Sequence, residues 1–228
     1  MANGLKQRRS IALVLSILWL QSAAILARDP SPMKRILVLG DSLSAGFGLR
    51  SNQAWPALVT EKLRVAGLTN FEITNASQTG GTTSGGLQRL PPHLKRKIDI
   101  FILELGINDG FRGVPIATIR NNLQAIVDQV RQRNPGVRVI VCGMQLPNSD
   151  EDEYVFAFGQ IYADLAVRNN ATLIPYLLEG VGGDSNLNQS DHIHPNAAGQ
   201  RILAENVWRV LEPIAREVAT AGAAAHVQ

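Results

Sequence analysis

Short apolar runs alternate with longer segments of helical periodicity, and this alternation limits the possible fold more than any other feature of the chain. The apolar runs are rich in Ile, Leu and Val and show no polar alternation. They are Ile36–Leu39, Phe71–Ile73, Ile98–Leu105, Val137–Met144 and Thr172–Tyr176. Runs of this kind are typical of parallel strands that are buried on both faces of a sheet. The sequence therefore predicts a parallel sheet of about five strands.

The segments between and after these runs have the spacing of amphipathic helices. Apolar residues recur at intervals of three and four between residues 116 and 130, and again between 203 and 214. Trp55–Ala66 and Glu153–Val167 are predicted as two further helices. Repeated strand–helix units joined by right-handed crossovers place helices on both faces of a parallel sheet. We therefore expect an α/β domain over residues 28–218, with no linker dividing it and a flexible tail over residues 219–228.

Residues 1–27 differ in composition from the rest of the chain. Three basic residues precede the apolar stretch Ile11–Leu20, and small residues follow it. This layout is typical of a secretory signal peptide, and the apolar stretch is short for a transmembrane helix. We predict a signal peptide cleaved near Ala24 or Ala27, export across the inner membrane, and a mature chain without an integral membrane span. An uncleaved N-terminal anchor is the alternative.

The charge of the chain argues against a nucleic-acid partner. The chain contains 22 Lys and Arg against 19 Asp and Glu, and three of the basic residues lie within residues 1–27, which contain no acidic one. The remainder is formally neutral, whereas a groove that binds phosphates needs a basic surplus.

Cys142 is the only cysteine, so no intramolecular disulfide can form. Its apolar neighbours indicate a buried small side chain rather than a reactive thiol.

Polar segments follow four of the predicted strand ends. They are Ser42, Asn75–Gly81, Gly106–Gly110 and, after a long loop, Asp191–His194. Ligands of open α/β sheets bind outside the carboxyl ends of the strands. We therefore expect these four segments to meet at one edge of the sheet, whatever the order of the strands.

The residue types in these segments suit nucleophilic catalysis at Ser42. A serine becomes a nucleophile when an imidazole takes its proton and a carboxylate orients the imidazole, which are the predicted roles of His194 and Asp191. The backbone N–H groups of Ser42 and Gly80 and the side-chain amide of Asn108 are the predicted oxyanion hole. Alone, each residue has a simpler explanation, as a helix cap, a turn or a loop residue. The ordered combination favours catalysis.

Other residues near these segments allow other interpretations. The pattern Asp191-His192-Ile193-His194 could indicate a metal site, but no third histidine stands nearby. Asp41 is expected to fix the loop that precedes Ser42, because adjacent residues on an extended backbone point in opposite directions. Glu104 stands within an apolar strand and could brace a neighbouring loop, since buried carboxylates are rare unless paired. It receives no function from the sequence.

Four short motifs resemble the signature blocks of the SGNH (GDSL-type) hydrolases and occur in the same order. They are Gly40-Asp41-Ser42-Leu43, Gly80, Gly106-Ile107-Asn108-Asp109 and Asp191-His192-Ile193-His194. The resemblance covers about Arg35 to Leu211. It is strongest to the periplasmic multifunctional acyl-CoA thioesterase I/lysophospholipase/arylesterase branch. Gly81 departs from that branch, in which an acidic residue is expected at this position.

The resemblance implies a flavodoxin-like three-layer αβα fold and a periplasmic serine esterase or thioesterase. It implies Ser42 as nucleophile, His194 as base, Asp191 as its partner, and an oxyanion hole of Ser42, Gly80 and Asn108. It implies neither cofactor nor metal, and it places substrate selection in the loop Gly110–Pro115, with Phe111 and Arg112 as candidates. The expected substrates are small acyl esters, including arylesters, acyl thioesters and lysophospholipids. A carbohydrate acetylesterase of the same mechanism and a non-catalytic binding module are the alternatives.

Overall fold

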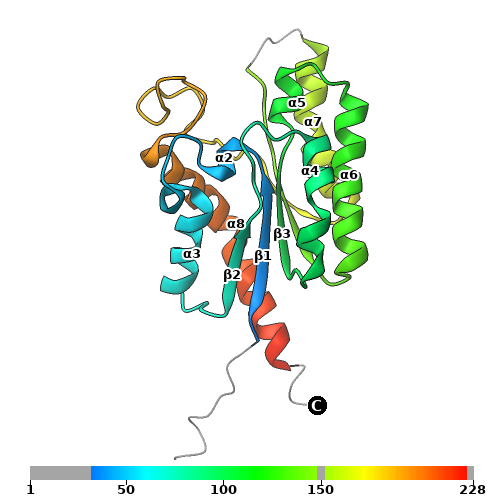
Figure 1. Ribbon diagram of the computed structural model, residues 1–228, viewed down its shortest axis with the longest axis vertical. Coiled ribbons are helices and arrows are strands. Elements are labelled where there is room, and N and C mark those ends of the chain that lie inside the picture. The colour runs from blue at the N-terminus through cyan, green and yellow to red at the C-terminus, as the bar shows by residue number, and fades with distance from the viewer. Residues whose placement is uncertain (1–31, 148–151, 225–228) are drawn as a thin grey trace, which may run out of the picture. The chain divides into compact units, whose positions relative to one another are not determined.

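A parallel sheet of five strands organises the part of the chain that the computed structural model describes, residues 32–147 and 152–224 (Figure 1). The strands are β1 (Lys34–Gly40), β2 (Phe71–Asn75), β3 (Ile100–Glu104), β4 (Arg138–Cys142) and β5 (Thr172–Ile174). Their order in the sheet is β2-β1-β3-β4-β5, and all four pairings are parallel. This is the flavodoxin-like order, in which the chain reverses its direction of winding between β1 and β3.

Helices cover both faces of this sheet. One face carries α3 (Trp55–Val65) and α8 (Ala197–Ala224), and the other carries α4 (Thr83–Arg89), α6 (Ile116–Arg133) and α7 (Glu153–Arg168) (Figure 1). Helices α3 and α8 pack against each other, as do α4 with α6 and α6 with α7. The predicted three-layer αβα fold and the five predicted strands are confirmed.

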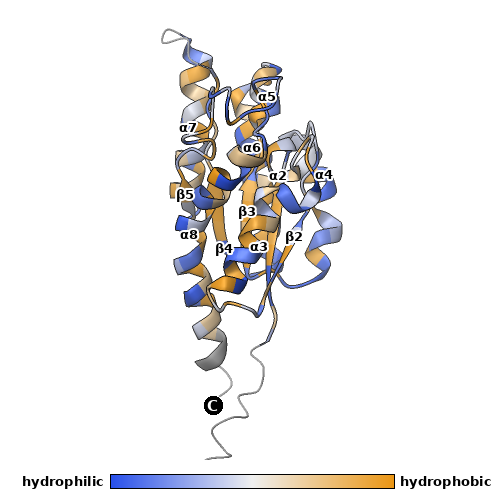
Figure 2. Cartoon of the chain, turned by 90° about the vertical axis from the view of Figure 1, so that its left-hand side faces the viewer, coloured by the Kyte–Doolittle hydropathy of each residue, from blue (hydrophilic) through white to orange (hydrophobic). Residues whose placement is uncertain are grey.

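The hydrophobic core lies between the sheet and its two helical layers. All residues of β1 and β3 are buried, as expected of central parallel strands. Helix α6 buries five apolar residues at helical spacing, namely Ile119, Leu123, Ile126, Val127 and Val130. Figure 2 shows the consequence, with hydrophobic strands at the centre and helices whose polar side faces outward.

Several short helices lie near the ends of the strands. They are α2 (Ser42–Ala45), α5 (Ile107–Phe111) and α4, together with the 3₁₀ turns Ser51–Gln53 and Pro91–Lys95. Helix α4 contains Gly85 and Gly86, which disfavour a helix in isolation. A side chain on Gly86 would collide with Leu105 and come close to Ile126. The glycine therefore allows the close packing of α4 that stabilises this helix in the fold.

The C-terminal helix extends further than we expected. Helix α8 continues to Ala224, past residue 219, where the tail was predicted to begin. Val218 and Ala219 pack against the core, and alanine is the strongest helix former. Extending an existing helix also needs no new nucleus. Residues 225–228 and the predicted signal peptide, residues 1–27, lie outside the described residues. No helix in the described part of the chain has the length and apolar character needed to cross a membrane.

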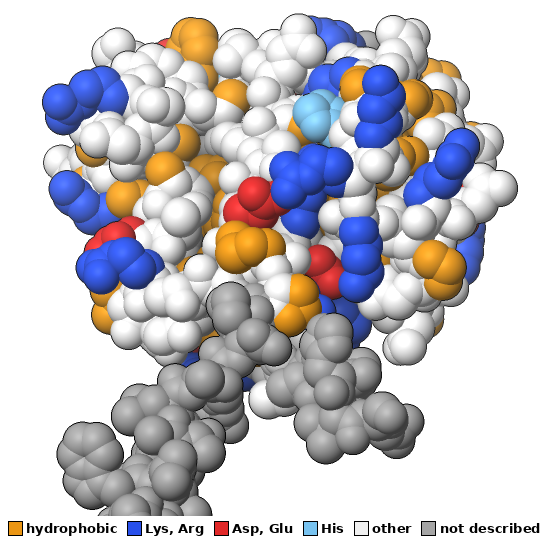
Figure 3. Space-filling view, turned by 60° about the horizontal axis from the view of Figure 1, so that its bottom comes forward, with side chains coloured by type: hydrophobic (Ala, Val, Ile, Leu, Met, Phe, Trp, Pro, Cys, Tyr) orange, Lys and Arg blue, Asp and Glu red, His pale blue; other side chains and the backbone are white. Residues whose placement is uncertain are grey.

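Lysine and arginine side chains surround the end of the domain at which the strands begin (Figure 3). Several of them pair with carboxylates: Arg138 Nη1 lies 2.5 Å from Glu217 Oε2, and Lys97 Nζ lies 3.0 Å from Asp99 Oδ1. This end of the sheet therefore carries mixed charge. It lies opposite the carboxyl edge, the edge at which the strands end and the predicted site residues gather.

Candidate active site

Ser42 begins a short helix directly after the central strand β1. It is the first residue of α2 and is only 6% exposed. The Asp41 carboxylate caps this helix, since Oδ1 accepts a hydrogen bond of 3.0 Å from the Leu43 N–H. This turn stands beside the end of β3, the neighbouring strand that leads to Asn108. Ser42 and Asn108 therefore flank the point where the winding of the sheet reverses, where ligands of this fold bind.

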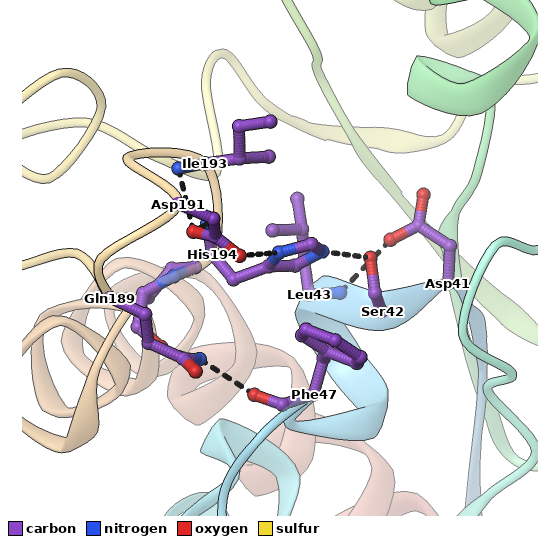
Figure 4. Close-up of polar contacts among 9 residues, drawn as sticks. Asp41, Ser42, Leu43, Phe47, Gln189, Asp191, Ile193 and His194 are labelled. Atoms are coloured by element: carbon purple, nitrogen blue, oxygen red, sulfur yellow. Dashed lines mark hydrogen bonds and ion pairs between the residues drawn. The ribbon is translucent and has the colours of Figure 1, made fainter.

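The structure brings Ser42, His194 and Asp191 into one hydrogen-bonded row (Figure 4). Ser42 Oγ lies 3.0 Å from His194 Nε2, although 152 residues separate the two in the chain. His194 Nδ1 lies 2.7 Å from Asp191 Oδ2. A proton on Nδ1, donated to the carboxylate, leaves Nε2 free to accept the hydroxyl proton of the serine. The row therefore has the geometry of a nucleophile, its base and the group that orients the base.

A tight turn holds the Asp191 carboxylate in place. Oδ1 accepts hydrogen bonds of 3.0 Å from the backbone N–H groups of both Ile193 and His194. The backbone N–H of His194, then its ring, and then the N–H of Ile193 lower the pKa of Asp191 to about 2. The carboxylate is therefore ionised at neutral pH, as required of a group that stabilises a protonated imidazole.

A second set of contacts joins the loop that carries His194 to the loop after α2. Gln189 Nε2 donates to the carbonyl oxygen of Phe47 at 2.7 Å and to that of Pro195 at 3.1 Å. The Phe47 and His194 rings contact each other, with centroids 4.4 Å apart and planes tilted by 43°. Gly48 has a φ of +73°, and a side chain there would collide with Gln189. Neither Phe47 nor Gln189 was predicted, because nothing in their residue types or spacing marks them.

The three predicted oxyanion donors differ in whether their N–H groups already donate hydrogen bonds. The backbone N–H groups of Ser42 and Gly80 donate to no other group within residues 32–147 and 152–224. Asn108 Nδ2 donates to Asp41 Oδ2 and to the carbonyl oxygen of Gly81, both at 3.1 Å. Both of its hydrogens are engaged. For Asn108 to act as the predicted oxyanion donor, one of these two hydrogen bonds would have to be exchanged for one to the oxyanion.

A cavity of about 560 Å³ opens beside Ser42 and His194. Asn108 and His192 also line it, and most of the remaining wall is apolar. The apolar part consists of Leu43, Ile107, Phe111, Leu146, Pro147, Leu178 and Ile193. Of the two residues predicted to contact substrate, Phe111 lines the cavity from α5, whereas Arg112 does not. Gly80 and Asp191 also lie outside the lining, the latter behind the imidazole.

The described residues offer no arrangement suited to a metal ion. No group of three or more His, Cys, Asp or Glu side chains in this part of the chain is placed to hold one. Both ring nitrogens of His194 are instead engaged with Ser42 and Asp191. His192, the other histidine of the suggested metal motif, has a φ of +59° and lines the cavity.

Comparisons with known proteins agree on one family. Residues 38–202 match the model of the GDSL-like lipase/acylhydrolase family. The chain is 39% identical over 193 residues to esterase TesA of Pseudomonas aeruginosa, covering 84% of this chain and 94% of that one. It is 35% identical over 180 residues to thioesterase 1/protease 1/lysophospholipase L1 of Escherichia coli K12, covering 78% and 84%. A crystal structure of TesA superposes with a TM-score of 0.75 at 40% identity, covering 79% of this chain and 99% of that one.

Proposed function

Because the chain belongs to the GDSL-like lipase/acylhydrolase family and is a carboxylic ester hydrolase, we propose that it cleaves acyl esters and thioesters through an acyl-enzyme on Ser42. The row Ser42–His194–Asp191 is the observation that carries this proposal. Ser42 Oγ attacks the carbonyl carbon of the ester while His194 Nε2 takes its proton. The Asp191 carboxylate stabilises the imidazolium that forms.

The remaining steps follow from the same groups. The tetrahedral intermediate places its negative charge near the N–H groups of Ser42 and Gly80 and the amide of Asn108. His194 then returns its proton to the leaving alcohol or thiol, and the carbonyl re-forms as an acyl ester of Ser42. Water, deprotonated by His194, attacks this ester. The acid is released and Ser42 recovers its proton.

The apolar wall of the cavity favours substrates with an acyl chain longer than acetyl. Leu43, Ile107 and Phe111 stand beside the reacting serine, and the cavity is large enough for several methylene groups. Burying apolar surface there would contribute to binding in proportion to its area. We therefore propose arylesters, acyl thioesters and lysophospholipids as the substrate class.

A panel of esters tests this proposal. With p-nitrophenyl esters of increasing acyl length, kcat/KM should rise by up to about fourfold per methylene until the cavity is filled. Acetylated sugars, an acyl thioester and a lysophospholipid complete the panel, and the Ser42→Ala variant is the control for each substrate. A clear preference for acetylated sugars would identify a carbohydrate acetylesterase instead. No turnover of any ester by folded protein would favour a binding module.

Asn108 should contribute to the rate of the chemical steps more than to substrate binding. Replacing it by alanine removes one donor to the oxyanion, and kcat should fall by about 10²-fold with a smaller change in KM. Steady-state kinetics with a p-nitrophenyl ester measure both constants. Asn52→Ala, at an exposed position away from the cavity, serves as the matched control. A change confined to KM would contradict a role in holding the oxyanion.

We also propose that the protein is exported to the periplasm. The basic start, the short apolar stretch and the small residues near Ala24 and Ala27 support this location. The mass of the protein recovered from a periplasmic extract would identify the cleavage site. A full-length chain that remains with the membrane fraction would indicate an uncleaved anchor.

A further inference from the structure

Glu104 is a fully buried carboxyl group beneath the turn that carries Ser42. It ends β3 and has no exposed surface. Oε2 accepts hydrogen bonds from the backbone N–H of Asp41 at 3.0 Å and from the hydroxyl of Ser44 at 2.5 Å. Oε1 is also buried and has no hydrogen-bond partner among the described residues. A buried oxygen without a partner costs free energy, so this atom calls for an explanation.

The Asp41 carboxylate lies next to Glu104 and is equally buried. Its Oδ1 accepts from the Leu43 N–H at 3.0 Å, and its Oδ2 accepts from Asn108 Nδ2 at 3.1 Å. The side chains of Asp41 and Glu104 are themselves within hydrogen-bonding reach of each other. Two ionised carboxylates cannot share such a contact, because like charges repel strongly where water is excluded.

We propose that Asp41 and Glu104, the carboxyl pair, share one proton carried by Glu104, and that the pair positions Ser42 and Asn108. A protonated Oε1 becomes a donor and finds its acceptor in the Asp41 carboxylate. Oε2 remains the acceptor for Asp41 and Ser44, so every polar atom of the pair is satisfied. Glu104 then acts through Asp41 as a positioning residue.

The surroundings of the carboxyl pair support a single negative charge. Burial raises the pKa of Glu104 well above its ordinary value, and the charge of Asp41 adds to this effect. Burial also raises the pKa of Asp41, to about 6, so that Asp41 is the member ionised at neutral pH. The Arg89 guanidinium on α4 faces both groups and donates to the Gly40 carbonyl at 2.6 Å. One cation thus faces one anion.

Three further titratable groups face the pair. Burial raises the pKa of the Cys142 thiol on β4 and of the Tyr162 phenol on α7 well above their ordinary values, so both stay neutral. The third is the His194 imidazole, which faces Asp41 across the site. The Cys142 thiol and the Tyr162 phenol therefore add no positive charge that would favour ionisation of both carboxyls.

The pair is packed so tightly that a shift of Glu104 would move the turn above it. A side chain on Gly40 would collide with Glu104 and Ser44. Trp55 Nε1 holds Ser44 Oγ at 3.1 Å, and this hydroxyl in turn donates to Glu104. Asp41 is therefore held in place by a chain of hydrogen bonds that runs from Trp55 through Ser44 to Glu104. This role rests on the proposed function, in which Ser42 attacks the ester and Asn108 donates a hydrogen bond to the oxyanion.

Two substitutions of Glu104 distinguish its hydrogen bonds as a neutral group from the space that its side chain fills. Glu104→Gln keeps an acceptor and a donor, and should retain most of the wild-type kcat. Glu104→Leu leaves the Asp41 N–H without its acceptor and should lower kcat by on the order of 10²-fold, with a smaller change in KM, because the reacting groups are displaced. Glu153→Gln, on the exposed first turn of α7, is the control. A folded Glu104→Gln variant without activity would overturn the proposal.

Infrared spectroscopy detects the proton without reference to activity. Wild-type protein at neutral pH should show the C=O stretch of a protonated carboxylic acid, and Glu104→Gln should lack this band while Glu153→Gln keeps it. If wild-type protein lacks this band, the shared proton is overturned, even if Ser42→Ala abolishes activity. If the band is present but Ser42→Ala leaves activity unchanged, the proposed function is overturned instead.

The pH dependence of stability provides a second measurement, which can be made even if the variant has little activity. A carboxyl whose pKa is raised by folding holds its proton more tightly in the folded state. Wild-type stability is therefore lost as pH rises above the unfolded pKa of about 4.3, until the folded pKa is reached. Glu104→Gln escapes this loss, so the ratio of wild-type to variant unfolding constants should rise by up to about tenfold per pH unit in that window. A ratio that falls with pH would contradict the shared proton.

Discussion

Replacing Ser42 by alanine is expected to lower kcat for a short p-nitrophenyl ester by about 10⁵-fold. The variant lacks the oxygen that forms the acyl-enzyme, and His194 loses the hydroxyl group from which it would take a proton. The oxyanion donors and the cavity remain, so slow hydrolysis by water and near-normal substrate binding should persist. Stopped assays at high enzyme concentration can measure this residual rate.

The Ser42→Ala result has a direct control in the same chain. Ser51 begins an exposed 3₁₀ turn outside the cavity lining, and Ser51→Ala should leave kcat unchanged. Circular dichroism and the thermal midpoint would show that both variants are folded. A kcat near the wild-type value in folded Ser42→Ala protein would mean that another group attacks the ester.

Replacing Asp191 by asparagine should lower kcat by about 10⁴-fold, mainly through the wrong tautomer of His194. The amide oxygen can still accept from the Ile193 and His194 N–H groups, which places the NH₂ group against the imidazole Nδ1. Nδ1 must then accept, so Nε2 carries the proton and cannot take another from Ser42. Kinetics at several pH values measure the loss, with Asp128→Asn, on the exposed side of α6, as the control.

The low pKa of Asp191 adds a pH test. A carboxylate whose pKa falls from 3.8 to about 2 on folding contributes stability above its unfolded pKa, and this contribution is lost as pH falls toward 2. The side chain is 35% exposed, so solvent screening keeps the contribution small. Because the pKa of Asp191 is about 2, its carboxylate stays ionised above about pH 4. Activity should therefore not depend on the protonation of Asp191 in that range. Full activity of Asp191→Asn protein would exclude the proposed role of this carboxylate.

The sheet was predictable because parallel strands buried on both faces leave a strong pattern. The continuous apolar runs of β1 and β3 are buried only if these strands lie at the centre of the sheet with helices on both faces. The carboxyl ends of parallel strands meet at one edge, so the convergence of Ser42, Asn108 and His194 followed without knowledge of the strand order. The distances between them depend on loop geometry, which no periodicity encodes.

Residues that act through packing or backbone groups were not predictable in the same way. Helix α4 forms despite two glycines, because Gly86 permits close contact with Leu105. Gln189 connects two loops through carbonyl groups, and carbonyl groups carry no information about residue type. Glu104 was conspicuous as a carboxyl in an apolar strand, but its partner Asp41 lies 63 positions away. Such pairings depend on tertiary contacts alone.

Labelling with a fluorophosphonate tests the central claim, that Ser42 is an activated nucleophile, most directly. The reagent phosphonylates a serine only when a base removes its proton, and peptide mass spectrometry locates the adduct. Wild-type protein should carry one phosphonyl group, on Ser42, with activity lost in proportion to labelling, and Ser42→Ala protein should carry none. Fully active wild-type protein without an adduct, or an adduct on another residue that accounts for the lost activity, would contradict the assignment of Ser42.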